Sequence, residues 1–264
     1  MDAPAVLLCY GWQTMTEPAP PLSADIRDEA ARLGGLILSA GIPARLMGGL
    51  AVWLSSPSVR EGPFARPYAD MDFVVAARGR VQLKTFLLDQ GYLPDQFFNA
   101  LHGATRLYFQ APDQRWSIDV VVDELAMSHK LDLRGRLEGP DLTITLADLL
   151  LTKLQVWEIN RKDLGDALCV LADHPVSTVG IDPARITEVL GADWGFGHTV
   201  ERNLASVAEL WAAEPVPAAT FDVAAQVASL KAVIQQAPKS FAWRARARVG
   251  ERVRWYETPE EVRH

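Results

Sequence analysis

Two aspartates, Asp70 and Asp72, open a run of β-forming residues that continues to Val75. The composition of this run predicts a strand. Because side chains alternate between the two faces of a strand, both carboxylates point to one face while Met71 points to the other. Any fold of this chain must therefore place two acids at one point on a sheet.

Such close carboxylates repel each other, and one of them holds its proton unless a cation lies between them. Mg²⁺ removes this repulsion and binds one or two carboxylates together with phosphate oxygens. An isolated Asp-x-Asp is more often a solvent-exposed strand face. The neighbouring motifs must decide between a metal site and an exposed surface.

The segments around this strand favour the metal site. Gly48 and Gly49 follow a short extended segment and precede a helical turn, where backbone amides hold phosphate oxygens, although a glycine pair alone is equally a tight turn. Asp119 interrupts an apolar strand, where burial of an unpaired charge would cost several kcal/mol. If its strand lies beside residues 70–75, Asp119 completes a cluster of three carboxylates suited to two metal ions about 4 Å apart. Asp123 is the competing acid, but it falls at the strand end, where an acid in a turn is expected.

The whole pattern predicts an α+β fold with a mixed sheet, followed by helices. Strands are expected at residues 70–75, 106–110 and 116–122, the last two joined as a hairpin, with an edge strand at 141–145. Helices are expected at 26–41, capped by Ser23, and at 81–90. The second half predicts helices only, at 146–157, 163–172, 183–190, 197–213 and 221–236, the first opened by a capping box at Thr145. The expected domains are residues 1–145, α+β, and residues 146–264, helical.

The order of these motifs resembles the nucleotidyltransferase superfamily that shares the DNA polymerase beta palm. In that superfamily a Gly-Gly or Gly-Ser turn is followed by Asp-x-Asp and later by a third carboxylate. The residues that match are Gly48, Gly49, Asp70, Asp72 and Asp119. Residues 149–155 and 161–166 also look like the Lys-Leu and Arg-Asp-x-x-Asp signatures of bacterial AbiEii-like nucleotidyltransferases, a group that includes toxin components. The resemblance covers residues 46–172.

Two positions depart from this pattern. Gly49 stands where many members have Ser, which removes a hydroxyl that would touch phosphate. The link from Gly49 to Asp70 is also longer than in compact members. In the second signature the basic residue is shifted, so either Arg161 or Lys162 takes its part.

The resemblance assigns roles to three residues of the second half. Lys153 is expected to place its cation on nucleotide phosphates, the alternative being a lysine that snorkels at the helix surface. Asp163 and Asp166 share a helix face, so they either orient Lys153 or a substrate group, or lie on a hydrated surface.

The resemblance implies Mg²⁺-dependent transfer of a nucleoside monophosphate from an NTP to a hydroxyl or phosphate of an acceptor. Asp70 and Asp72 would hold metal that bridges the triphosphate, and Asp119 would hold a second ion and help to deprotonate the acceptor. Gly48 and Gly49 would place the phosphate oxygens. The acceptor is a small molecule, a protein or tRNA, and an antitoxin is a further partner that the resemblance allows. The alternatives are a non-catalytic nucleotide-binding module of the same fold and a toxin-type nucleotidyltransferase acting on tRNA.

Composition narrows the class of protein. The 264 residues are 49% apolar, which suffices for a sizeable core, and their formal charge of −7 lacks the positive field of nucleic-acid-binding proteins. The opening residues lack the basic stretch of a secretory signal, and Pro43 and Arg45 break the longest apolar region, so no membrane span is expected. Cys9 and Cys169 lack metal-ligand spacing, which predicts a reducing cytoplasm and a buried thiol at Cys169.

A basic segment near the C-terminus stands out against this acidic composition. It runs from Arg244 to Arg254 beside Trp243, Trp255 and Tyr256. The segment suits RNA phosphates and stacked bases, or else forms a tail that is salt-bridged onto the acidic body. The five histidines lack metal spacing and are expected to be structural or surface residues: His102, His129, His174, His198 and His264.

Overall fold

A computed structural model of the protein describes residues 22–258. Within them, the main sheet has five strands in the order β1-β2-β5-β4-β3. The strands are β1 (Ala44–Met47), β2 (Asp70–Val75), β3 (Leu93–Pro94), β4 (Arg106–Gln110) and β5 (Ser117–Val122). β2 and β5 are parallel, and the other neighbouring pairs are antiparallel. The predicted α+β class with a mixed sheet is confirmed.

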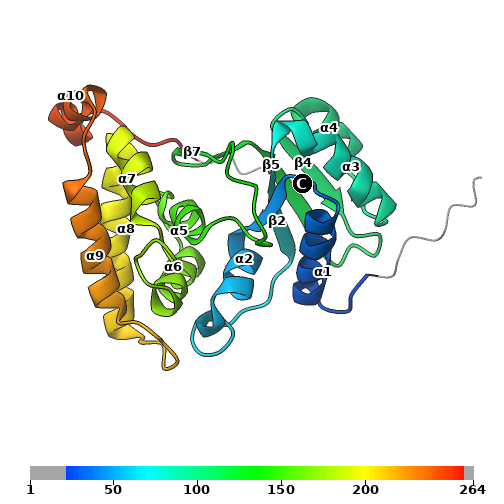
Figure 1. Ribbon diagram of the computed structural model, residues 1–264, viewed down its shortest axis with the longest axis horizontal. Coiled ribbons are helices and arrows are strands. Elements are labelled where there is room, and N and C mark those ends of the chain that lie inside the picture. Colours follow the sequence, from blue (N-terminus) through cyan, green and yellow to red (C-terminus); the bar gives the residue numbers. More distant parts are fainter. Residues whose placement is uncertain (1–21, 259–264) are drawn as a thin grey trace, which may run out of the picture.

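Helices flank the sheet and form the second half of the chain (Figure 1). The first four are α1 (Ile26–Ser39), α2 (Gly48–Ser55), α3 (Arg80–Asp89) and α4 (Gln96–His102). The later ones are α5 (Leu146–Leu154), α6 (Arg161–Asp173), α7 (Pro183–Ala192), α8 (Trp194–Ala213), α9 (Val223–Gln236) and α10 (Phe241–Val249). Between the halves lies a small hairpin of β6 (Glu124–Ala126) and β7 (Lys130–Asp132). The sequence patterns did not predict this hairpin, α4 or α10.

Two helix starts test the predicted caps. The cap of α1 is Asp25, whose carboxylate accepts from the Arg27 amide at 2.8 Å, and not Ser23. The Ser23 amide instead donates to Glu29 at 2.9 Å, and the serine lies two residues before the cap. The cap of α5 is Thr145, as predicted.

The expected edge strand at 141–145 was wrong. Only one bridge forms there, between Leu46 and Thr143. The Leu46 amide donates to the Leu142 carbonyl and the Ile144 amide donates to the Leu46 carbonyl, both at 2.9 Å, and the chain then turns into α5 at its cap, Thr145, which ends the pairing.

Helix α5 ends earlier than predicted, at Leu154. The amide of Asn203, from α8, donates to the carbonyls of Leu154 and Val156 at 2.8 Å each. Asn203 thus provides hydrogen-bond donors for carbonyls at the end of α5 that have no partner within the helix. Because Asn203 is far away in the sequence, the local periodicity of residues 146–157 does not predict this end.

The burial of β2 changes along its length. Phe73, Val74 and Val75 are fully buried, where α1 and α2 pack against the strand. Asp70 is exposed and Asp72 is partly buried at the other end. The core therefore holds the strand by its C-terminal residues and leaves the two acids at its open end.

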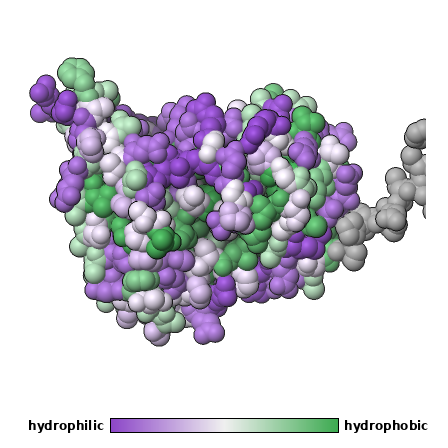
Figure 2. Space-filling model, in the orientation of Figure 1, coloured by the Kyte–Doolittle hydropathy of each residue, from purple (hydrophilic) through white to green (hydrophobic). Residues whose placement is uncertain are grey.

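Figure 2 shows hydrophilic side chains over much of one face, with hydrophobic ones gathered in patches across its middle. Cys169 is fully buried, as predicted, and burial raises the pKa of its thiol, while Cys9 and His264 lie outside the described residues. No helix in residues 22–258 has the length and apolar character needed to cross a bilayer.

Candidate functional site

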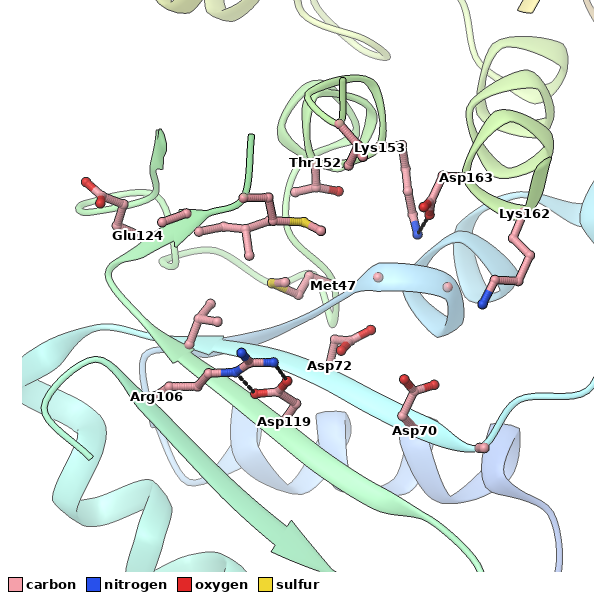
Figure 3. Close-up of a pocket in the computed structure, with 18 of the residues that line it drawn as sticks. Met47, Asp70, Asp72, Arg106, Asp119, Glu124, Thr152, Lys153, Lys162 and Asp163 are labelled. Atoms are coloured by element: carbon pink, nitrogen blue, oxygen red, sulfur yellow. Dashed lines mark hydrogen bonds and ion pairs between the residues drawn. The ribbon is translucent and has the colours of Figure 1, made fainter. Parts of the chain in front are cut away.

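A cavity of about 830 Å³ lies between the open end of the sheet and the first helices of the second half. Asp70, Asp72 and Asp119 line it from the sheet, and Gly48 and Gly49 line it from the start of α2. Lys153 extends from α5 and Lys162 from α6 toward the carboxylates (Figure 3). Of the eight site residues expected from the sequence, all but Asp166 line this cavity, and Asp166 contacts Lys153 Nζ at 3.0 Å.

The two acids of β2 both face this cavity, as strand alternation requires (Figure 3). Burial raises the pKa of Asp72 to about 7, and repulsion from Asp70 and Asp119 adds to the effect. Near pH 7 the Asp72 carboxyl is therefore protonated in only part of the molecules. Of the acids in the cavity, it is the one whose charged form a nearby cation would stabilise most.

The Gly48 backbone has a φ of 70°, a left-handed conformation that glycine adopts without strain. A Cβ atom at this position would collide with the Asp72 carboxylate. The N-cap residue Met47 provides no side-chain hydrogen bond to the first turn of α2. The first turn of α2 therefore has no side-chain cap, and it begins directly beside the Asp72 carboxylate.

The second glycine of the turn is explained by the loop that precedes β2. A Cβ atom at Gly49 would lie 2.9 Å from Arg66 Nη2 and 3.0 Å from Tyr68 Cε1. A guanidinium thus occupies the space next to the position where Ser is common in the family that the sequence resembles. This loop is the long link between the turn and the Asp-x-Asp strand.

Asp119 lies directly beside Asp72, because the two residues are register partners of the parallel strands β5 and β2. Both of its oxygens accept from Arg106 on β4, with Nε to Oδ1 at 2.8 Å. Asp123 stands in the turn after β5 with a φ of 63° and accepts from the Ala77 amide. The structure therefore places Asp119, and not Asp123, beside Asp72, and Asp119 already has Arg106 as a cationic partner.

Lys153 is buried, so the snorkelling alternative was wrong. Its Nζ lies 2.8 Å from Asp163 and 3.0 Å from Asp166. Asp166 also accepts two hydrogen bonds from Arg66, at 2.6 and 2.8 Å. Burial alone would lower the pKa of Lys153, but the two acids outweigh it and raise this pKa. The two carboxylates therefore orient Lys153. This is one of the alternatives that the spacing of Asp163 and Asp166 left open.

The structure distinguishes the two basic residues at the start of α6. Arg161 turns to Glu214, 2.5 Å away on the surface. Lys162 lines the cavity and has no ion pair within residues 22–258. Lys162 is therefore the one of the two that faces the cavity.

The acids of the cavity limit the number of Mg²⁺ ions that it can hold. The part of the chain that the structure describes contains no group of three or more acidic, His or Cys side chains that could hold a metal ion. Asp70 and Asp72 alone match the one or two carboxylates that Mg²⁺ needs when phosphate supplies its other ligands. The residues fit one ion brought with a phosphate ligand, and Asp119 is tied to Arg106.

The basic segment makes few contacts with acids. Among the residues described, Arg244, Arg246, Arg248, Arg252 and Arg254 form no ion pair with a carboxylate. Arg246 donates to the carbonyls of Gly250 and Val253, and Arg254 lies over Tyr256. The alternative of a tail salt-bridged onto the acidic body was wrong.

The histidines behave as predicted where they are described. His129 is buried against Phe196 and contacts Thr199, His174 contacts the Ser55 carbonyl, and His198 pairs with Glu251. His102 lines the far side of the cavity, without acids or cysteines placed to share a metal within residues 22–258.

Comparisons with known proteins give little beyond this geometry. No protein-family model matches the sequence, and no curated protein matches it. Among solved structures, the chain is similar to an antigenic nucleotidyltransferase-like protein from Paracoccidioides brasiliensis at 15% identity and a TM-score of 0.39. The match covers 84% of this chain and 98% of the other.

Proposed function

We propose that this protein is a Mg²⁺-dependent nucleotidyltransferase that transfers a nucleoside monophosphate from an NTP to an acceptor. The contact between Gly48 and the Asp72 carboxylate carries the proposal. It sets a phosphate-binding helix start directly beside the acid most in need of a cation. Bound there, Mg²⁺ would neutralise phosphate charge and hold the triphosphate in place for in-line attack.

The residues of the chain divide this work between them. Asp70 and Asp72 would hold the ion, and the amides of Gly48 and Gly49 would orient phosphate oxygens. Lys153 has three N–H donors, two of which reach Asp163 and Asp166, so one remains for the ligand. Lys153, Asp163 and Asp166 also combine the two signatures of AbiEii-like enzymes into one unit, which supports a place in that group.

The reaction is tested by mixing the protein with each NTP, Mg²⁺ and a panel of acceptors, and by measuring pyrophosphate. The panel contains total tRNA, small alcohols and phosphates, and cell protein. Arg244 and Arg248 of α10 form no ion pair with a carboxylate within residues 22–258, and they favour tRNA within this panel, because phosphates pair well with guanidinium groups. Pyrophosphate release that requires both Mg²⁺ and one acceptor supports the proposal, and its absence for every acceptor rejects catalysis.

The second candidate is a nucleotide-binding module without catalysis. Its support is that Arg106, Arg66 and Lys153 are each already paired with a carboxylate. This candidate predicts NTP binding in calorimetry without any pyrophosphate release.

Lys162 gives a direct test of the cavity cations. We expect Lys162→Ala to weaken NTP binding by about threefold to fivefold, since an exposed charge contributes up to about 1 kcal/mol. Arg161→Ala is the matched control, because that neighbour faces Glu214 and should leave binding unchanged. Titration calorimetry at low salt measures both, and equal losses would contradict the placement of Lys162.

The raised pKa of Asp72 predicts a pH dependence. Below about pH 7 the ion must displace a proton from Asp72, so Mg²⁺ affinity should fall about tenfold for each further pH unit. The stability of the protein without Mg²⁺ should change in the opposite direction, and fall as the pH rises. Folding raises this pKa above the ordinary value of 3.8, so the contribution of Asp72 is present at low pH and is lost as pH rises toward 7. Calorimetry with an NTP analogue at pH 6 and pH 8 tests the first effect, and a flat Mg²⁺ affinity would contradict it.

A further inference from the structure

Arg106 holds Asp119 in a way that a two-metal site would not allow. In the antiparallel pair of β4 and β5, Tyr108 lies opposite Asp119, and Arg106 stands two residues further along on the same face. From there its guanidinium reaches both carboxylate oxygens of Asp119 (Figure 3). Both residues line the cavity beside Asp72.

This ion pair conflicts with a metal ion on Asp119. A guanidinium stays charged at every relevant pH, so an ion on the same carboxylate would lie a few ångströms from a fixed positive charge. The oxygens that would bind the ion already accept from Nε and Nη2 of Arg106. The second of the two ions expected from the sequence therefore does not fit this site.

The Arg106 guanidinium itself supplies the positive charge that the site lacks without a second ion. Arg106 has five N–H donors, and it uses two of them in hydrogen bonds to Asp119. Its side chain is 35% exposed. The remaining donors are open to the cavity, and arginine forms strong charge-assisted bonds with phosphate.

We propose that Arg106, fixed by Asp119, takes the place of the second divalent cation, and that the site works with one ion on Asp70 and Asp72. This inference rests on the proposed nucleotidyl transfer. In that reaction the acceptor oxygen bonds to the α-phosphorus as the bond to the bridging oxygen breaks. Pyrophosphate leaves with the electron pair of that bond, and the acceptor proton passes to water. Arg106 offsets charge on the reacting phosphate, and Asp119 is a positioning residue for Arg106.

The ion count tests this inference directly. Electron paramagnetic resonance measures bound Mn²⁺ per chain in the presence of an NTP analogue that cannot release pyrophosphate. We expect one ion on the wild-type protein. Arg106→Gln frees Asp119, so a second ion should bind, and nucleotide affinity at Mn²⁺ concentrations that fill only one site should fall about tenfold. Arg106→Lys keeps the charge and should keep the count at one.

Arg134→Gln is the matched control. Arg134 binds Asp132 with the same two-bond pattern, from Nε and Nη2, but on the exposed surface outside the cavity. Its ion count and nucleotide affinity should equal those of the wild type.

The outcomes separate this inference from the proposed function. Two ions on the wild-type protein overturn the role of Arg106 while leaving nucleotidyl transfer intact. A single ion and wild-type nucleotide affinity in folded Arg106→Gln overturn it as well. A folded wild-type protein that binds no ion with the analogue rejects the proposed function itself.

Discussion

Replacing Asp72 with Asn is expected to lower Mg²⁺-dependent nucleotide turnover by about a thousandfold or more. The amide cannot supply the charged oxygen that the ion needs, and metal binding contributes several kcal/mol of charge stabilisation. The substitution is isosteric, and it removes a carboxylate whose pKa is raised to about 7 by burial and by Asp70 and Asp119. Without Mg²⁺ at pH 8, the variant should therefore be at least as stable as the wild type.

Steady-state pyrophosphate release and urea unfolding on the same preparations measure the two effects. Asp89→Asn is the control, since Asp89 is an exposed acid at the end of α3 outside the cavity. Unchanged turnover in Asp72→Asn would remove the metal assignment. Loss of stability together with turnover would point to a structural role for this carboxylate.

The substitution Lys153→Met is expected to affect both stability and binding. It keeps the aliphatic packing of a buried side chain but leaves Asp163 and Asp166 with one fewer cation. Breaking such a buried pair lowers the free energy of unfolding by about 3 kcal/mol. The affinity for NTP should fall tenfold or more, because a charge-assisted contact of about 1.5 to 3 kcal/mol is lost.

A double variant separates these two consequences. Adding Asp163→Asn to Lys153→Met removes one uncompensated acid, so it should recover part of the stability but none of the NTP affinity. Lys84→Met, on the exposed face of α3, should change neither quantity by a measurable amount. If Lys153→Met binds NTP as tightly as the wild type, Lys153 only supports the fold.

The arrangement of the acids on the sheet follows from the sequence. Strand alternation puts Asp70 and Asp72 on one face, and the hairpin of residues 106–122 predicts that the strand of Asp119 is antiparallel to its neighbour. The structure agrees on the faces, and β4 and β5 pair as expected. These features were predictable because hydrophobic alternation and turn chemistry are local properties of the chain.

The partners of the charged residues were not predictable in this way. The register of the hairpin places Arg106 diagonally from Asp119, so this pair had a weak signal in the sequence. Arg66 lies in an irregular loop, and no spacing connects it with Asp166, 100 residues later. Helix α10 and the β6–β7 hairpin were missed for a different reason, since short elements carry little periodicity.

Local patterns along the chain predict most of the helices and strands, the faces of the strands and the acids near the open end of β2. The cations that accompany these acids depend on packing between elements: Arg106 on Asp119, Lys153 between Asp163 and Asp166, and Lys162 instead of Arg161 at the cavity. Periodicity reports only which residues are buried on one element. An ion pair depends on side chains from separate elements that meet only after packing, and the free energy of each pair is set by the burial that this packing creates.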